Sequence, residues 1–153
     1  DKGSRGERED KSGPLIAQML TAAGYVVEET MILPDEAKAL KAQLIRMADG
    51  RQVNLVLTTG GTGFSPRDIT PEATCAVADR NAPGIAEAMR YHSLSITPRG
   101  MLSRGVSVLR GKTLIVNLPG SPKAVQENLE YILPSLEHGV RIAAGLDGEC
   151  ARK

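Results

Sequence analysis

The chain has 153 residues, with 19 lysines and arginines against 18 aspartates and glutamates, and a formal net charge of +1. This length fits one domain, residues 1–153, that can bury a core without disulfides. Cys75 and Cys150 fit no metal-binding spacing, so we expect both to be reduced thiols in a cytoplasmic protein. The balanced charge and the scarcity of aromatic side chains argue against a nucleic-acid partner, and the absence of an apolar run of about 18 residues argues against a membrane partner.

Helices and strands are predicted to alternate in the first half of the chain. Ser12 and Pro14 favour a helix start, and Gly24 favours its end. β-branched side chains then favour a strand, and a later apolar run favours a second, buried one. The predicted elements are a polar loop over 1–11, a helix over 12–24, a strand over 25–33, a helix over 34–50 and a strand over 53–57.

The second half is predicted to hold a hairpin and a long final helix. Gly111 and Lys112 separate two apolar runs, which is the spacing of a two-residue hairpin turn. The predicted elements are helices over 71–81 and 83–91, a looser stretch over 98–103, strands over 106–110 and 113–117, and a helix from 121 to 144. The apolar stripe of the last helix is Val125, Leu129, Ile132, Leu136, Val140 and Ile142.

This alternation predicts an α/β fold, a three-layer α/β/α sandwich with a mostly parallel sheet and one antiparallel hairpin. Ligands in such folds bind at the carboxyl ends of the strands. Glycine-rich turns follow Leu57 and Leu118, both at predicted strand ends, so we expect the two turns to converge on one pocket. A βα unit normally begins with a strand, so a strand is also expected ahead of the loop that starts at Asp1.

The first glycine turn has the composition of a ligand-binding loop. Gly60, Gly61 and Gly63 let the backbone approach a ligand where a Cβ atom would clash. Thr70 is placed to cap the next helix, with Pro71 in its first position, so that free N–H groups face an anion.

Two familiar phosphate-binding patterns do not fit the chain. A Walker loop that ends at residues 111–113 would need glycine in place of Val106. A dinucleotide fingerprint that begins at Gly61 would need glycine in place of Pro66.

Charged residues at the predicted strand ends are candidates for phosphate chemistry. Asp68 either caps the helix at residue 70 or is available to hold Mg²⁺ against a bound phosphate. Arg67 either forms a surface ion pair or neutralises the phosphate directly. Asp35 follows the predicted strand 25–33 and either caps its own helix or lies near Asp68. Two carboxylates at neighbouring strand ends suit metal-assisted phosphoryl or nucleotidyl transfer.

The second glycine turn covers residues 119–122. Ser121 is a helix cap and Pro122 a first helical residue, which needs no ligand but places another helix N-terminus at the same sheet edge. Ser103 and Arg104 precede the hairpin and offer a hydroxyl and a guanidinium, although an exposed arginine is common at a strand start.

Three motifs occur together in this sequence. They are TTGGTG at 58–63 followed by PRDITPEAT at 66–74, LSR at 102–104, and NLPGSP at 117–122. Together they resemble the MogA/MoaB molybdenum-cofactor family, which includes the gephyrin G domain. Asp1 resembles the aspartate that ends the family's first strand, and we expect that strand to be missing before residue 1. The sequence PDE at 34–36 matches a further signature of the family.

The resemblance implies a molybdopterin-binding fold, usually a homotrimer. Active members transfer AMP from ATP to the terminal phosphate of molybdopterin with Mg²⁺, and pyrophosphate leaves. The implied catalytic and metal-binding carboxylates are Asp68 and Asp35, and other molybdenum-cofactor enzymes are implied partners. The implied pterin and phosphate contacts are Asp1, Thr59, Gly60, Gly61, Thr62, Gly63, Arg67, Thr70, Ser103, Arg104, Pro119, Gly120, Ser121 and Pro122.

Two other functions stay open at this point. Some relatives keep the fold without the activity, so a non-catalytic molybdopterin-binding or scaffold protein of the MoaB type is the alternative to an enzyme. A pyridine-nucleotide hydrolase domain of the competence-damage type is a third interpretation, but that group carries an additional large domain.

Overall fold

The computed structural model describes residues 9–146, so the candidate ligand residue Asp1 lies outside the described residues. The helices are α1 (Ser12–Ala22), α2 (Ala37–Ile45), the π-helical turn η1 (Arg46–Gly50), α3 (Thr70–Val77), α4 (Pro83–Ile96), the 3-10 helix η2 (Pro98–Leu102) and α5 (Pro122–Ala143). The strands are β1 (Leu55–Thr59), β2 (Arg80–Asn81), β3 (Ser107–Arg110) and β4 (Thr113–Leu118).

The described strands form one mixed sheet in the order β1-β4-β3-β2. β1 and β4 are parallel, with Leu55 opposite Leu114. β3 and β4 form the predicted antiparallel hairpin, and Gly111 at its turn has a φ of +53°, which glycine adopts readily. β2 adds a second antiparallel pair beside β3. The predicted α/β class and the hairpin are confirmed, and the described sheet has one parallel and two antiparallel pairs.

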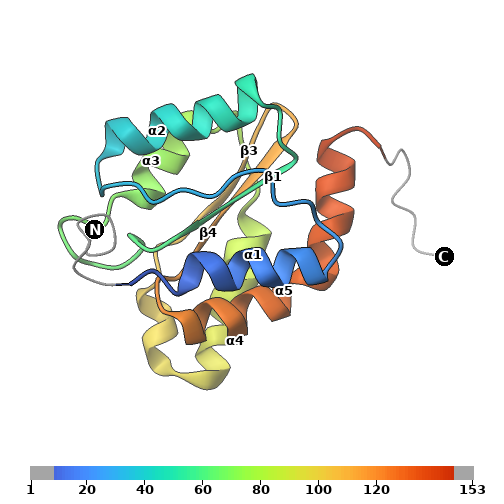
Figure 1. Ribbon diagram of the computed structural model, residues 1–153. Helices are drawn as coiled ribbons and strands as arrows, with labels where there is room; N and C mark the ends of the chain where they lie inside the picture. Colours follow the sequence, from blue (N-terminus) through green and yellow to red (C-terminus); the bar gives the residue numbers. More distant parts are fainter. Residues whose placement is uncertain (1–8, 147–153) are drawn as a thin grey trace.

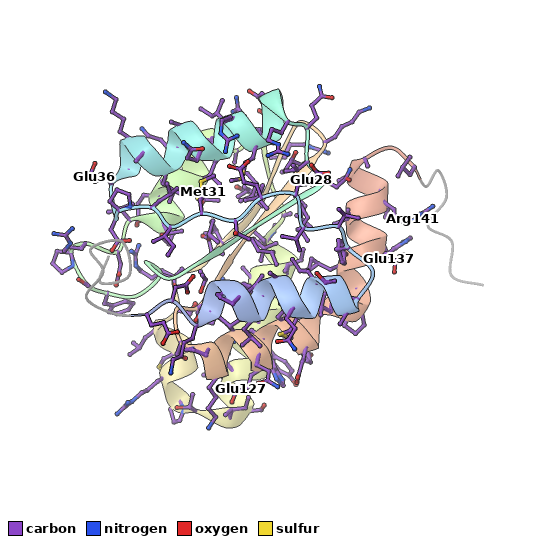
Figure 2. The ribbon with its side chains drawn as sticks, viewed as in Figure 1. Glu28, Met31, Glu36, Glu127, Glu137 and Arg141 are labelled. Carbon is purple, nitrogen blue, oxygen red and sulfur yellow. The ribbon has the colours of Figure 1, made fainter. Side chains whose placement is uncertain are left out.

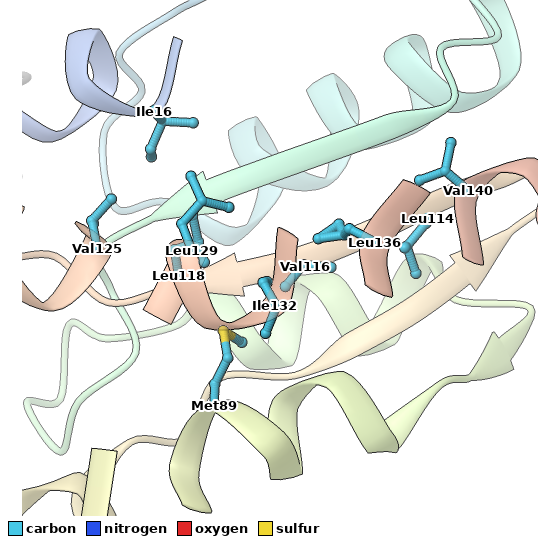
Figure 3. Packing of buried hydrophobic residues seen from close by; sticks show 10 residues of the cluster. All are labelled: Ile16, Met89, Leu114, Val116, Leu118, Val125, Leu129, Ile132, Leu136 and Val140. Atoms are coloured by element: carbon cyan, nitrogen blue, oxygen red, sulfur yellow. The ribbon is translucent and has the colours of Figure 1, made fainter. Parts of the chain in front are cut away.

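Helices cover both faces of the sheet, so the predicted three-layer arrangement is confirmed. α1, α4 and α5 lie on one face, and α2 and α3 lie on the other (Figure 1). Side chains that alternate along β4 pack against the helices on both faces of the sheet. Leu114, Val116 and Leu118 pack with α5 on the first face (Figure 3), whereas Ile115 packs with α2 and α3 on the second.

Residues 25–33 are extended but form no strand, so that prediction was wrong. The segment crosses between α1 and α2 (Figure 1), and Glu28 and Met31 on it are labelled in Figure 2. A strand needs a hydrogen-bonding neighbour about 4.8 Å away, and none of the described strands pairs with this segment, which lines a cleft together with β1. Ion pairs hold it instead: Glu29 pairs with Arg46 and Arg51, and Glu28 also pairs with Arg51.

Three helix predictions need correction. α3 ends at Val77 rather than near residue 81, because the chain then turns to pair with β3 as β2. α4 continues past residue 91 to Ile96. In α5 the predicted stripe is buried except for Ile142, which is 40% exposed, and this helix bends and contains Pro134 (Figure 1). Among the helices between residues 9 and 146, none combines the length and the apolarity that a membrane crossing requires.

Candidate active site

The two glycine turns meet at the carboxyl ends of β1 and β4, as predicted. The Gly60 amide donates to the Leu118 carbonyl at 3.2 Å, and the Thr59 hydroxyl donates to the Pro119 carbonyl at 2.7 Å. A Cβ atom on Gly120 would lie 3.3 Å from the Gly60 Cα. Backbone therefore lies close against backbone at this point, and a side chain at position 120 would push the two turns apart by a few tenths of an ångström.

The start of α1 is fastened to the second glycine turn. The Ser12 hydroxyl donates to the Gly120 carbonyl at 2.9 Å. The Asp10 carboxylate accepts from the Ser12 and Gly13 amides at 3.1 and 3.0 Å, so Asp10 rather than Ser12 caps this helix. Sequence reasoning missed this role of Ser12, although an aspartate two residues before a predicted helix is a recognisable signal for the cap.

Gly61 lies between Asp35 and Thr70. Its φ is +66°, and a Cβ atom there would overlap the Thr70 hydroxyl and lie 3.7 Å from the Asp35 Oδ1. The Thr70 amide also donates to the Gly61 carbonyl at 3.1 Å. The N-cap residue of α3 is Ile69, and Thr70 follows it as the first helical residue. No side chain caps this helix, so the predicted capping role of Thr70 was wrong.

Asp68 closes a tight turn beside the same loop. Its carboxylate accepts from the Ser65 amide at 3.0 Å, and its own amide donates to the Ser65 carbonyl at 2.9 Å. A Cβ atom on Gly63 would lie 2.8 Å from the Asp68 Oδ2. The Asp35 and Asp68 carboxylates therefore lie against glycines that are two residues apart, a span of about 7 Å at most.

These groups open onto one large cleft of about 1260 Å³. The cleft extends from the extended segment 25–33, past the face of β1, to the glycine loop. The predicted site residues that line it are Asp35, Thr59, Gly60, Gly61, Arg67, Asp68, Thr70, Gly120 and Pro122. The other predicted site residues within 9–146 do not line it: Thr62, Gly63, Ser103, Arg104, Pro119 and Ser121.

Ser121 and Pro122 begin α5 at the edge of the cleft. The Ser121 hydroxyl accepts from the Ala124 amide at 3.2 Å, so its predicted role as the cap is confirmed. Pro122 is the first helical residue, as predicted. Pro122 has no amide hydrogen and the Val125 amide donates to the Ser121 carbonyl at 2.9 Å, so the Lys123 amide is the first-turn donor left for an anion.

Arg104 bonds to the glycine loop outside the main cleft, where it lines a second, open pocket of about 450 Å³ with Asp68 and Glu72. Its Nε donates to the Gly63 carbonyl at 2.7 Å, and its Nη2 donates to the Asp68 carbonyl at 2.6 Å. Its Nη1 pairs with the Glu72 carboxylate, and this hydrogen bond lowers the pKa of Glu72 below its ordinary value. The sequence offered Arg104 either as a ligand contact or as an ordinary exposed arginine at a strand start, and the three contacts described here are to the protein.

A buried polar network beneath the turns joins β4 to its neighbours. Asn117 is 1% exposed, and its amide donates to the Thr58 and Thr74 hydroxyls at 2.9 and 3.0 Å. Its carbonyl oxygen accepts from the Val106 amide at 3.1 Å. The Asn117 side chain thus makes three hydrogen bonds, two as donor and one as acceptor, and these bonds fix the strand ends under the site. A polar residue that ends an apolar run was the available signal for this network.

The carboxylates suit a metal ion that substrate phosphates help to hold. Among residues 9–146, no three His, Cys, Asp or Glu side chains gather as a complete metal cage. Mg²⁺ commonly uses only one or two protein carboxylates, and phosphate oxygens and waters supply the rest. Asp35 and Asp68, which line one cleft, meet that requirement.

Comparison with known proteins gives consistent results. A family described as a probable molybdopterin binding domain matches residues 1–138. The molybdopterin adenylyltransferase of Escherichia coli K12 is 46% identical over 134 residues, which is 86% of this chain and 69% of that protein. That of Helicobacter pylori J99 is 42% identical over 149 residues, 95% of this chain and 84% of that protein. The crystal structure of the molybdopterin biosynthesis enzyme MoaB from Thermus thermophilus has a TM-score of 0.90 at 48% identity, and the match covers 95% of this chain and 91% of that one.

Proposed function

This chain belongs to the family of probable molybdopterin-binding domains, and on that basis we propose that it is a molybdopterin adenylyltransferase. In the proposed reaction, an oxygen of the terminal phosphate of molybdopterin attacks the α-phosphorus of ATP. A new phosphorus–oxygen bond forms, the bond to the β-phosphate oxygen breaks, and pyrophosphate leaves with that electron pair. The products are adenylyl-molybdopterin and pyrophosphate.

The observation that carries the proposal is the meeting of two glycine turns and two carboxylates on one cleft. The Gly60 and Gly120 backbones touch, and Asp35 and Asp68 line the same opening. Transfer between two polyanions needs alignment and charge compensation rather than a nucleophilic side chain. The arrangement of these residues fits that need.

Each group has a role in this scheme. The bare backbone of the glycine loop admits the pterin and its phosphate, and the Lys123 amide in the first turn of α5 donates to a phosphate oxygen. Arg67 lines the cleft and places a positive charge near the nucleotide. Asp68 and Asp35 would hold Mg²⁺, which when bound supplies charge stabilisation to the phosphates. The remaining predicted contacts apart from Arg104, among them Thr62, Ser103 and Asp1, belong to this proposal as well.

The proposal extends to the setting of the reaction. We expect a homotrimer in the cytoplasm that passes its product to other molybdenum-cofactor enzymes. Sedimentation or light scattering of the purified protein measures the oligomeric state directly.

The test is pyrophosphate release from ATP and molybdopterin in the presence of Mg²⁺. We expect release by the wild-type protein and a loss of at least about 100-fold in Asp68→Asn and Asp35→Asn. Glu36→Gln is the matched control, since it removes an exposed carboxylate one residue from Asp35 that does not line the cleft (Figure 2). Binding of molybdopterin without any release would instead support the non-catalytic, scaffold function.

A further inference from the structure

Arg104 joins three separate segments around the candidate site. Its guanidinium bonds to the carbonyls of Gly63 and Asp68 and to the Glu72 carboxylate, which belong to the glycine loop, the following turn and the first turn of α3. A planar guanidinium presents its donors in a fixed fork, so these contacts set the positions of their acceptors relative to one another.

The segment that carries Arg104 is itself anchored. The Arg104 amide donates to the Thr62 carbonyl at 2.9 Å. On its other side, Arg90 of α4 donates to the Gly105 carbonyl at 2.6 Å and to the Ser103 carbonyl at 3.4 Å. A continuous set of arginine–carbonyl contacts thus connects a rigid helix to the loop that presents Asp68.

We propose that Arg104 is a positioning residue: it holds the loop from Gly63 to Asp68 in the shape that the reaction requires and does not bind a substrate phosphate. Glu72 fixes the guanidinium in turn. The inference rests on the proposed function, because the group that Arg104 positions is the Asp68 carboxylate.

Two observations favour positioning over phosphate binding. Arg104 does not line the main cleft, whereas Arg67 does. The charge of Arg104 is also balanced by Glu72, which is ionised at neutral pH and whose pKa the hydrogen bond from Arg104 lowers. An arginine whose charge is balanced by a carboxylate and whose Nε and Nη2 bond to carbonyls gives little attraction to a further anion.

Amide hydrogen exchange of the ligand-free protein tests the positioning directly. In Arg104→Gln, we expect the Asp68 and Thr70 amides to exchange about tenfold faster, the effect of losing about one charge-assisted hydrogen bond. Arg104→Lys should not restore the protection, because an ammonium cannot reproduce the fork. Unchanged exchange of the β3 and β4 amides is the check that each variant remains folded.

Kinetics with ATP and molybdopterin give the second readout. We expect kcat of Arg104→Gln to fall by about 10- to 100-fold through displacement of Asp68, while KM for molybdopterin changes by less than about threefold. Glu72→Gln should lower kcat in the same direction, and the double variant should be no worse than Arg104→Gln alone.

Other results would overturn the inference. A raised KM with an unchanged loop, full activity in Arg104→Lys, or tighter substrate binding in Glu72→Gln would make Arg104 a phosphate ligand. If the wild-type protein releases no pyrophosphate, the proposed function fails, and the exchange experiment still decides whether Arg104 positions the loop.

Discussion

Alanine at Gly61 tests the geometry of the site more sharply than any other single change. A φ of +66° costs an alanine about 1–2 kcal/mol. The added Cβ would also overlap the Thr70 hydroxyl and lie 3.3 Å from the Thr70 Cβ, in a position where Thr70 is only 5% exposed. Overpacking of this kind costs about 1–3 kcal/mol more. We therefore expect Gly61→Ala to lower the free energy of unfolding by about 2–5 kcal/mol.

Gly111→Ala is the matched control. Gly111 has a φ of +53° at the hairpin turn, and an added Cβ there meets nothing within 4 Å. This variant should lose only about 1–2 kcal/mol and keep full activity. Gly61→Ala should lose about 100-fold in pyrophosphate release as well, because the displaced loop carries the site.

Denaturant unfolding measures the stabilities, and a double variant isolates the overlap. In a Thr70→Ala background, which removes the overlapping hydroxyl but keeps the Cβ at position 70, Gly61→Ala should cost less than it does in the wild-type protein. Equal destabilisation by the two glycine substitutions, together with normal turnover in Gly61→Ala, would show that the loop does not approach Thr70 as described.

Four further outcomes are expected. Asn117→Ala should lower the free energy of unfolding by about 1–3 kcal/mol, since the Val106 amide loses its acceptor, and denaturant unfolding measures this. Ser121→Ala should cost about 1 kcal/mol in the same assay through loss of the α5 cap, and no change would show that the cap is not formed in solution. Arg104 lowers the pKa of Glu72, so their pairing stabilises the folded protein fully above the ordinary glutamate pKa of about 4.3 and is lost as the pH falls through the lowered pKa. Amide exchange of the loop, corrected for intrinsic rates, should therefore rise in that pH range in the wild-type protein. It should not rise in Glu72→Gln, which has no carboxylate to protonate. Chelation of divalent cations should abolish pyrophosphate release and added Mg²⁺ should restore it, whereas full release in excess chelator would refute the metal requirement.

Local sequence signals were sufficient for most of the fold and for the convergence of the two turns. Gly111 marks the hairpin, and Ser121 with Pro122 marks the start of α5, because each depends on neighbours within a few residues. The meeting of Gly60 and Gly120 followed from topology, since both turns leave strands at the same sheet edge.

Features that depend on distant partners were not predictable. The contacts of Arg104 reach residues 32 to 41 positions away, and Ser12 reaches Gly120 across 108 positions. Residues 25–33 have strand-like composition, but a strand forms only beside another strand, and composition carries no information on that neighbour. Composition thus identified the charged residues at the site but could not separate those that face the cleft from those that support it.

β1 is the outermost strand of the described sheet on the side of the cleft. Within residues 9–146, its outward-facing peptide groups have no strand beside them. Such a margin acts as a template onto which an extended polypeptide adds by main-chain pairing.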